Sequence, residues 1–402
     1  MKPFPTLLAA ALALAAACGS STGPMPPPPP PPPPSPPPAP ALVAQIPIPP
    51  QYGIHDTYLR DGFALACVWN TGLVIYDVGN GIRGGSPSNP VEVSRIVPSD
   101  DSVPGGPAVH SAWWFHNPVT GEGRYVFTSQ EGPLSIPGAS SGDVHVIDVS
   151  DLSHPREVAG YHMNADPSAG SHNFWMDEAA QVLYVAYYNG GVVALDVSGT
   201  LAGNLAGREI GRIKPLPSSF MWGVQLSGGS LYATDFLNGL YQLRLSGNGL
   251  AVVGGGPNVP ERYTSDLWVS GSYAYTGTWG GVARNGVFGN VVKVWRLGAG
   301  GAPAIADSIV LDSVVTLNDV KGSEDGRLLA VSADKGEKAG LYLYSLSNPA
   351  HPVLVGQALV AAGIHTARVA TIAGRRYVFA AKNPGTPVSP ALLIYDVTGL
   401  VP

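Results

Sequence analysis

Four histidines stand at the start of similar segments of this chain. His55, His110, His172 and His365 are each followed by a segment of aromatic and β-branched residues. A neutral imidazole is a good ligand for zinc, copper, nickel and iron. If the fold brings these side chains together, they could bind a transition metal, and zinc or copper are the ions we consider first.

The segments that carry these histidines are copies of one repeat. Three more copies begin with Trp222, Ser265 and Asn318, and the seven starting positions are separated by 55, 62, 50, 43, 53 and 47 residues. Repeats of this length that are rich in strand residues and lack helical patterning are typical of β-propeller blades. We therefore predict an all-β fold, a seven-bladed β-propeller of four-stranded antiparallel blades.

The two ends of the repeat region predict how the ring closes. The seventh copy ends with a strand over 392–397, and little of the chain follows it. Residues 42–48 precede the first copy and have no blade of their own. We expect this N-terminal segment to complete the seventh blade, with Pro47 at a sheet edge where no backbone donor is needed.

Equivalent positions of a propeller lie at equal radius around its axis, so the histidines should meet. Blade seven is adjacent to blade one, and the four histidines therefore occupy consecutive blades. We expect an arc of imidazoles on one side of the central channel. Asp56, Asn173, Asp266 and Asp319 directly follow starting positions and could orient the rings. The other side chains expected to line the channel are Asp56, Asn173, Trp222, Asp266, Asn318 and Asp319.

Two other interpretations of the histidines stay open. An imidazole at the start of an inner strand can bond to neighbouring backbone and hold blades together, and the replacements by Trp, Ser and Asn in three copies are compatible with that role. A pocket for an apolar or polar ligand is the other alternative. We expect His116, His145, His154, His162 and His351 to be solvated or to face strands. Packing between blades, or lining of a channel mouth, is expected for Trp113, Trp114, Trp175, Trp268 and Trp279.

Composition limits the classes of function. The chain has 402 residues, of which 12% are charged, and a formal charge of −6. No stripe of Lys and Arg is present, which argues against nucleic-acid binding. Low charge with 51 Gly and 40 Pro residues is typical of an all-β protein outside the cytoplasm. Cys67 lies in an apolar run and is expected to be a buried thiol rather than a reactive one.

The N-terminus has the features of an export signal. In residues 1–17, Lys2 is followed by a Leu/Ala run over 7–17, which is too short for a permanent membrane span. The Ala-Ala-Ala-Cys sequence that ends at Cys18 resembles a bacterial lipobox, although the Leu lies four residues before the Cys instead of three. The resemblance implies that Cys18 is lipidated. An ordinary signal peptide with an incidental Cys is the alternative.

A spacer separates this signal from the repeats. Residues 18–41 are dominated by Pro, which favours extended polyproline II and a length of roughly 50 Å for the Pro run. The predicted organisation is therefore a signal peptide over 1–17, a lipidated Cys18 with a spacer to residue 41, and a propeller over 42–402. We expect a monomer in the bacterial cell envelope, at the outer membrane or cell surface, held to the membrane only by its lipid.

Several phrases resemble the bacterial LVIVD-repeat family of secreted and surface proteins. They are Gly-Leu-Val-Ile-Tyr-Asp-Val at 72–78, Ser-Asn-Pro-Val-Glu-Val at 88–93, Val-Ser-Asp-Leu-Ser-His-Pro at 149–155 and Ser-Asn-Pro-Ala-His-Pro-Val-Leu-Val-Gly at 347–356. The resemblance is strongest in blades one, two, six and seven and weaker in blades four and five. It implies a seven-bladed surface or secreted propeller and carries no catalytic residue over to this chain.

Two short motifs with catalytic or cofactor associations do not fit their surroundings. The Gly-x-Gly-x-x-Gly at 79–84 is followed by a Pro-rich segment instead of the helix that a dinucleotide site needs. The Gly-x-Ser-x-Gly at 138–142 lies in a Gly/Ser/Pro loop rather than a strand-to-helix turn. The sequence thus predicts a non-catalytic module that binds an extracytoplasmic protein or polymer. The alternative is a metal-dependent enzyme, an oxidoreductase or lyase, built on the four histidines.

Overall fold

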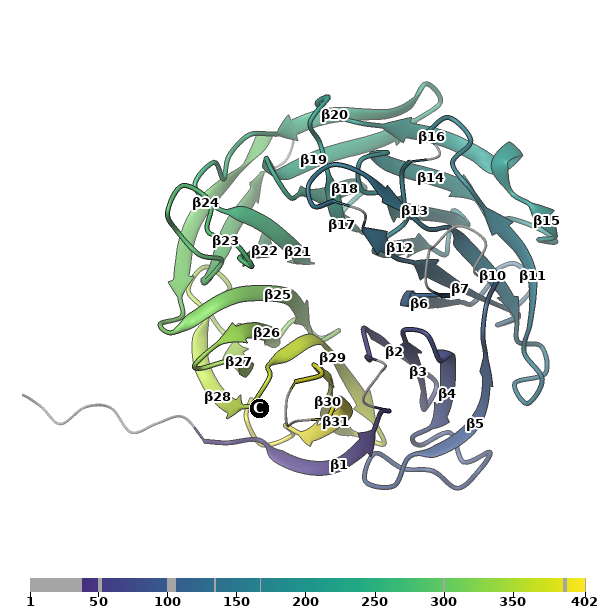
Figure 1. Ribbon diagram of the computed structural model, residues 1–402, viewed down its shortest axis with the longest axis horizontal. Helices are drawn as coiled ribbons and strands as arrows, with labels where there is room; N and C mark the ends of the chain where they lie inside the picture. Colours follow the sequence, from purple (N-terminus) through teal and green to yellow (C-terminus); the bar gives the residue numbers. More distant parts are fainter. Residues whose placement is uncertain are drawn as a thin grey trace, which may run out of the picture. The chain divides into compact units, whose positions relative to one another are not determined.

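Seven antiparallel sheets surround a central axis in the computed structural model (Figure 1), which confirms the predicted seven-bladed β-propeller. From the axis outward, blade one consists of β2 (Thr57–Arg60), β3 (Phe63–Val68), β4 (Gly72–Asp77) and β5 (Val91–Ile96). Blade two consists of β6 (Val109–Phe115), β7 (Tyr125–Gln130), β10 (Val144–Asp148) and β11 (Arg156–Tyr161). Blade three consists of β12 (Phe174–Asp177), β13 (Val182–Ala186), β14 (Val192–Asp196) and β16 (Glu209–Ile213).

Blades four to seven follow the same plan. Their strands are β17 (Met221–Ser227), β18 (Ser230–Asp235), β19 (Gly239–Ser246), β20 (Gly249–Gly255); β21 (Tyr263–Ser270), β22 (Tyr273–Trp279), β23 (Val291–Gly298), β24 (Gly301–Val310); β25 (Val314–Gly322), β26 (Leu328–Gly336), β27 (Gly340–Ser345), β28 (Val353–Leu359); and β29 (Ile364–Ile372), β30 (Arg375–Lys382), β31 (Ala391–Asp396), β1 (Ala41–Pro47). Blade two gains a short parallel edge strand, β15 (Gly203–Asn204), followed by the 3-10 turn η1 (Ala206–Arg208), and β8 (Gly132–Pro133) pairs with β9 (Ser140–Ser141) beside it.

The structure describes residues 38–49, 53–99, 106–133, 135–166, 168–298, 301–385 and 389–401. All of them belong to the compact unit formed by residues 37–402, and none to the unit formed by residues 1–36. The predicted signal peptide, Cys18 and most of the spacer therefore lie outside the described residues. Within the described ranges, no helix is both long and apolar enough to cross a membrane.

The N-terminal strand closes the ring, as predicted. β1 pairs antiparallel with β31 in the seventh blade, from Ala41 opposite Asp396 to Pro47 opposite Ala391, and the two strands lie side by side in Figure 1. β1 has no other neighbour in its sheet, so Pro47 occupies an edge where its missing N–H leaves no ladder bond unmade. Closure removes an exposed edge from the last C-terminal strand, β31.

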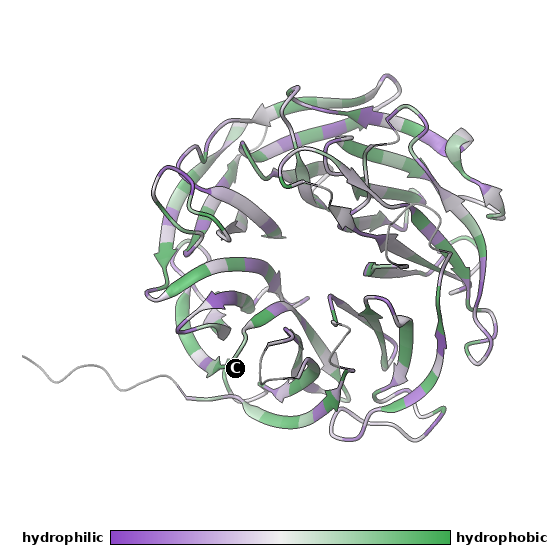
Figure 2. Ribbon diagram, viewed as in Figure 1, coloured by the Kyte–Doolittle hydropathy of each residue, from purple (hydrophilic) through white to green (hydrophobic). Residues whose placement is uncertain are grey.

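The hydrophobic core lies between the blades. Every residue of β3 and β4 is buried, whereas the outermost strand β24 is largely exposed and mixes hydrophilic with hydrophobic residues (Figure 2). Buried clusters join adjacent blades, because their sheets stack face to face around the ring. Cys67 is fully buried in β3 as a free thiol, which confirms that expectation.

The Gly-rich loop at 79–84 is organised by an acidic side chain rather than prepared for a nucleotide. One carboxylate oxygen of Asp77 accepts hydrogen bonds from the backbone N–H groups of Gly79, Asn80 and Gly81 at 2.9–3.1 Å. The other accepts from Arg83 and Gly85 at 2.7 and 3.1 Å. The loop donors that a phosphate would need are thus already bound to a carboxylate.

Candidate metal centre in the channel

An irregularity in the innermost strands turns the first residues of each repeat toward the axis. We number each repeat from its starting residue, so that His110 is a first position and Ser111 a second position. In five blades, the pairing of the innermost strand shifts register across the first position. The shifts lie between Val109 and Ala112, Met221 and Gly223, Thr264 and Leu267, Leu317 and Asp319, and Ile364 and Ala367. A bulge of this kind leaves its extra residue unpaired and re-aims its side chain.

The four histidines lie side by side. The ring centroids of His55 and His110 are 3.8 Å apart, and those of His110 and His172 are 4.1 Å apart. On the other flank of His55, the ring of His365 lies at 4.0 Å. The structure therefore places the imidazoles of four consecutive blades in one row along the channel.

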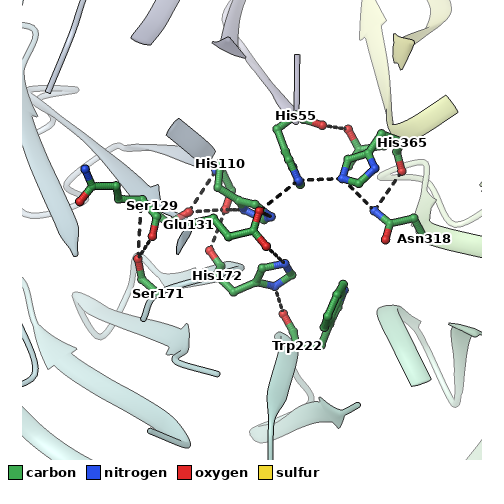
Figure 3. A network of polar contacts seen from close by, with 12 residues as sticks. His55, His110, Ser129, Glu131, Ser171, His172, Trp222, Asn318 and His365 are labelled. Atoms are coloured by element: carbon green, nitrogen blue, oxygen red, sulfur yellow. Dashed lines mark hydrogen bonds and ion pairs between the residues drawn. The ribbon is translucent and has the colours of Figure 1, made fainter. Parts of the chain in front are cut away.

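A buried carboxylate lies at the centre of this row (Figure 3). Glu131 follows β7, and its oxygens lie 3.4 Å from Nε2 of His55, 3.8 Å from Nε2 of His110 and 3.9 Å from Nε2 of His172. These separations are too long for hydrogen bonds. Nε2 of His110 is buried and has no hydrogen-bond partner at all.

Three imidazole nitrogens and a carboxylate thus converge without bonding to one another. Two ligands at about 2.1 Å from a tetrahedral zinc ion are about 3.4 Å apart, because the ion lies between them. The separations between Glu131 and the three histidines are of this size. One ligand atom from each of His55, His110 and Glu131 lies within 4.8 Å of the others, whereas His172 lies outside this group and faces the second carboxylate oxygen. The donor set fits a transition metal that prefers nitrogen ligands.

Hydrogen bonds on the far side of the rings fix the tautomers that metal binding requires. Nδ1 of His172 donates to the backbone carbonyl of Trp222, so its Nε2 keeps a lone pair. Ser111 donates its only hydroxyl proton to the carbonyl of His172 at 2.9 Å. The Ser111 oxygen must then accept from Nδ1 of His110 at 3.0 Å, which leaves the lone pair of His110 on Nε2 as well. Such outer partners are typical of metal-binding histidines.

His365 has a different environment from the other three. Its Nε2 lies 2.7 Å from Nε2 of His55, which is a hydrogen-bond distance and closer than two ligands of one ion would lie. Its Nδ1 lies 3.2 Å from the carboxylate of Asp334, and the amide nitrogen of Asn318 lies 3.2 Å from its Nε2. We interpret His365 as a neighbour that positions His55, rather than as a primary ligand in this arrangement.

The electrostatic environment keeps the three central imidazoles neutral. Burial lowers the pKa of His55 and His110 well below the usual value, and the neighbouring histidines lower it further. Burial also lowers the pKa of His172 to about 3, despite its bond to the Trp222 carbonyl. Burial opposes the charged form of His365, but the hydrogen bond to Asp334 and the negative charges of Asp334 and Glu131 together outweigh burial and raise the pKa of His365. Neutral imidazoles are the form that binds metals.

Glu131 belongs to a second set of equivalent residues that sequence reasoning missed. In each blade, the third repeat position pairs with a residue of the second strand. The residue three positions after that partner lies toward one mouth of the channel. These residues are Trp69, Glu131, Tyr188, Phe236, Trp279, Asp334 and Asn383. Four of them are aromatic and three are Glu, Asp or Asn, so no shared residue type marks the position, and the strand register connects them.

Five of these residues line a cavity that also reaches three of the histidines, and they are Trp69, Glu131, Trp279, Asp334 and Asn383. Its volume is about 450 Å³, and Trp69, Trp222 and Trp279 supply most of its apolar wall. His55, His172, His365 and Glu131 line its base. The hydroxyl of Tyr188 donates to Glu131, and burial raises the pKa of this carboxyl. A volume of this size is typical of a small-molecule site.

The second repeat positions form a separate acidic layer. Asp56, Asn173, Asp266 and Asp319 line a narrow space under His55, His110 and His172, together with Trp222 and Asn318. Their hydrogen bonds do not reach the imidazoles, in contrast to the expectation that they orient the rings. Asp266 and Asp319 instead hold the ammonium of Lys321, the latter at 2.8 Å. Burial opposes the charge on Lys321, but the two carboxylates outweigh it and raise its pKa.

Side chains other than the histidines form most of the side-chain-to-backbone hydrogen bonds between adjacent blades around the channel. Backbone carbonyls around the channel accept hydrogen bonds from Ser111, Ser265, Asn318 and Thr366 of the preceding blade. Among the histidines, His172 alone has such a bond in the described network, from its Nδ1 to Trp222. The predicted structural role therefore applies to one nitrogen of His172 and leaves its Nε2 free.

The remaining histidines lie outside this site. Each has an acidic partner of its own within 3.4 Å, and the pairs are His116–Asp61, His145–Glu157, His154–Asp151, His162–Asp143 and His351–Asp307. The loop motif at 138–142 places the hydroxyl of Ser140 against Asn189 at 2.7 Å and follows no strand-to-helix turn. Neither set contributes to the channel.

Solved structures share this fold at low sequence identity. Raptor from Chaetomium thermophilum aligns with a TM-score of 0.62 at 10% identity over 90% of this chain, which spans 29% of the Raptor chain. A putative 6-phosphogluconolactonase from Bacteroides fragilis aligns with a TM-score of 0.56 at 15% identity, over 89% of this chain and 93% of its own. Sqt1 from Saccharomyces cerevisiae aligns with a TM-score of 0.55 at 10% identity, over 84% and 82%. These likenesses concern the fold alone.

The sequence comparisons support the predicted family. No curated protein matches the chain. The LVIVD repeat family matches residues 139–162 and 261–282, in blades two and five. The second match lies in blade five, where the family's characteristic phrases are weaker in the sequence. Two stretches of this propeller therefore match the LVIVD repeat, which is the family that the sequence predicted.

Proposed function

We propose that this propeller is a metal-dependent enzyme that binds one transition-metal ion in its channel. His55, His110, His172 and Glu131 would hold the ion, and His365 would position His55. The observation that carries the proposal is the convergence of three Nε2 atoms on a buried carboxylate, with Nε2 of His110 unpaired. Of the two functions predicted from the sequence, this geometry favours the metal-dependent one.

The cavity above the ligands gives the proposal its catalytic part. A bound ion would act as a Lewis acid or activate a water molecule at a position open to the cavity. Trp69, Trp222 and Trp279 would exclude bulk water and hold the apolar part of a small substrate. The amide of Asn383 donates to Asp334, which fixes the carboxylate that contacts His365. The reaction would be that of an oxidoreductase or a lyase, the two classes that the sequence analysis named.

Metal analysis of protein made without a polyhistidine tag tests the metal site. The mature domain is stripped with a chelator, offered zinc or copper, and passed through a desalting column before elemental analysis. We expect about one tightly bound ion per chain, since a buried preformed site binds metals strongly. His110→Ala and Glu131→Ala should each lose this ion and keep the fold, as judged by circular dichroism.

His145 provides the matched control. It is also a buried histidine of blade two, but it contacts Glu157 and Gln130 away from the axis. His145→Ala should therefore keep the metal. A wild-type protein that retains neither zinc nor copper after reloading, or equal retention in His110→Ala and His145→Ala, would refute the proposed centre.

We further propose that the enzyme works outside the cytoplasm of a bacterium. A lipid attached to Cys18 would hold it to the membrane. The Leu/Ala run before Cys18 and the Pro-rich stretch after it support this location.

A further inference from the structure

The opposite mouth of the channel carries its own set of equivalent side chains. Side chains alternate along a strand, so the fourth repeat position points the same way as the second, further along the channel. The seven fourth positions are Tyr58, Trp113, Trp175, Gln225, Trp268, Lys321 and Arg368. Four of them are aromatic, and three of these belong to consecutive blades.

The aromatic side chains form a continuous curved wall. The ring centroids of Tyr58 and Trp113 are 5.1 Å apart, those of Trp113 and Trp175 are 5.2 Å apart, and those of Trp175 and Trp268 are 6.2 Å apart. Successive rings are inclined by 40°, 62° and 67°, so they curve around a space rather than stack. Tyr58, Trp113 and Trp175 line a cavity of about 590 Å³.

The charged groups of this cavity are mainly acidic. Asp61, Asp177, Glu178 and Glu324 line it, against a single base, Arg60. Arg60 contacts both carboxylate oxygens of Glu178. In the described part of the chain, Asp177 and Glu324 belong to no ion pair. The open part of the cavity therefore combines π faces with excess negative charge.

The deeper part of this mouth already shows a cation against an aromatic ring. The guanidinium carbon of Arg368 lies 5.4 Å from the centroid of Tyr58. Lys321 is bound by Asp266 and Asp319, so its charge is compensated below the wall. Trp268 presents a buried Nε1 without a hydrogen-bond partner at the narrow end.

We propose that this mouth is a second ligand site, independent of the metal centre, that binds an organic cation of the alkylammonium class. The faces of Trp and Tyr attract such cations, most strongly when the cation is desolvated. The acidic side chains add long-range attraction for positive charge and disfavour anions. The ligand could be a free small molecule or a methylated basic side chain of a larger partner, since both present the same alkylated ammonium.

Calorimetry with choline and its neutral isostere 3,3-dimethyl-1-butanol tests the proposal. The two probes have the same shape, so the difference isolates the positive charge. We expect choline to bind the wild-type domain at least about tenfold more tightly than the isostere. A short peptide with trimethyl-lysine distinguishes the sources, because tighter binding than choline would indicate a protein partner.

Two tryptophan variants locate the site. Trp175→Ala should weaken choline binding by at least about tenfold, as truncation of a central aromatic contact does. Trp279→Ala, on the metal-side mouth, should leave choline binding unchanged. If Trp175→Ala fails to fold, Glu324→Gln replaces it, because Glu324 is exposed and makes no described ion pair; a several-fold weakening is then expected.

Three results would overturn the cation site. They are equal binding of choline and the isostere, no choline binding at millimolar concentration, and choline binding that survives both Trp175→Ala and Glu324→Gln. The metal variant His110→Ala should bind choline normally. A protein that lacks metal but binds choline normally would contradict the metal centre alone. A protein that binds metal but not choline would contradict the cation site alone.

Discussion

The two mouths of the channel are built from the same seven strands but present different chemistry. At one end, the first repeat positions place His55, His110 and His172 around a carboxylate under an apolar cavity. At the other end, fourth positions of the same strands place Tyr58, Trp113 and Trp175 beside acidic groups. The repeat decides where a side chain lies, and the residue type at that position decides what the end can bind.

A buried charged layer keeps the two ends apart. Asp266, Asp319 and Lys321 fill the channel between them, and their mutual contacts satisfy most of their charge. The two sites should therefore respond separately to substitution, unless the ring itself is damaged. The predictions below test this separation.

Deletion of residues 42–50 should have the largest effect and should abolish both sites together. It removes all of β1 except Ala41, leaves β31 as an exposed edge and removes the partners of five paired residues. We expect a loss of stability above about 4 kcal/mol, beyond the usual range of single substitutions. Thermal unfolding followed by circular dichroism measures it. A shortened domain that melts like the parent would mean that β1 does not hold the ring closed.

Lys321→Met should cost about 3–5 kcal/mol, because it leaves two buried carboxylates without their cation. Urea unfolding of the domain measures the change in free energy. Adding Asp266→Asn should recover part of the loss, since one of the uncompensated charges is then removed. The exposed Lys335 is the control, and Lys335→Met should change stability little. Equal effects of both lysine variants would show that the buried carboxylates do not depend on Lys321.

A pair of substitutions on one strand should separate the two ends directly. His110 and Trp113 both lie on β6, three residues apart. His110→Ala should weaken metal binding by more than about 100-fold, because a direct ligand matters more than an outer partner. Trp113→Ala should weaken choline binding and retain the metal. Metal and choline titrations of both variants measure this, and a variant that loses both ligands while still folded would break the separation.

Asp77 lines neither of the two channel cavities, and its substitution should act mainly on stability. Burial opposes its charged form, but five backbone N–H groups outweigh burial and lower its pKa to about 2. A carboxyl whose pKa is lower in the folded state stabilises the fold above its unfolded pKa of about 4 and loses this contribution as the pH falls to about 2.

Asp77→Ala should therefore cost about 1–3 kcal/mol at neutral pH. The gap between variant and parent should shrink when unfolding is repeated between pH 4 and pH 2, about the range set by the two pKa values. A gap that stays constant over this range would show that the charge of Asp77 is not what organises the loop.

Cys18→Ser should have the smallest effect on the folded domain and leave both mouths unchanged. If Cys18 carries the lipid, the variant should leave the membrane fraction or accumulate as an uncleaved precursor, because the residue that holds the lipid is then missing. Cell fractionation with mass determination distinguishes these results. A processed variant that stays on membranes after a salt wash would contradict the lipid anchor.

The sequence was sufficient for the ring and for half of the candidate site. Spacing of strand-rich copies predicts seven blades, and the unpaired segment before His55 predicts the closing strand. The row of histidines follows from their shared repeat position. Glu131 and Asp334 could not be found in this way, because equivalent copies have Trp69, Tyr188 and Asn383, none of which carries a carboxylate. Their position depends on strand register, which the sequence alone does not specify.

The role of the second repeat positions was also beyond the sequence. Asp56 and Asp319 directly follow first positions, which suggested that they orient the neighbouring imidazoles. A bulge separates the two positions, so the carboxylates lie in a layer of their own and Lys321 reaches them from below. Backbone irregularities of this kind leave little trace in residue type.

Closure by β1 also has a mechanical consequence. If the domain is tethered through Cys18, any drag on it is transmitted through the residues before Ala41 into the ladder between β1 and β31. β1 has one neighbouring strand, whereas the inner strands of its blade have two. The ladder that completes the ring would then bear the load of the tether, and under tension β1 should detach before any other strand of its blade.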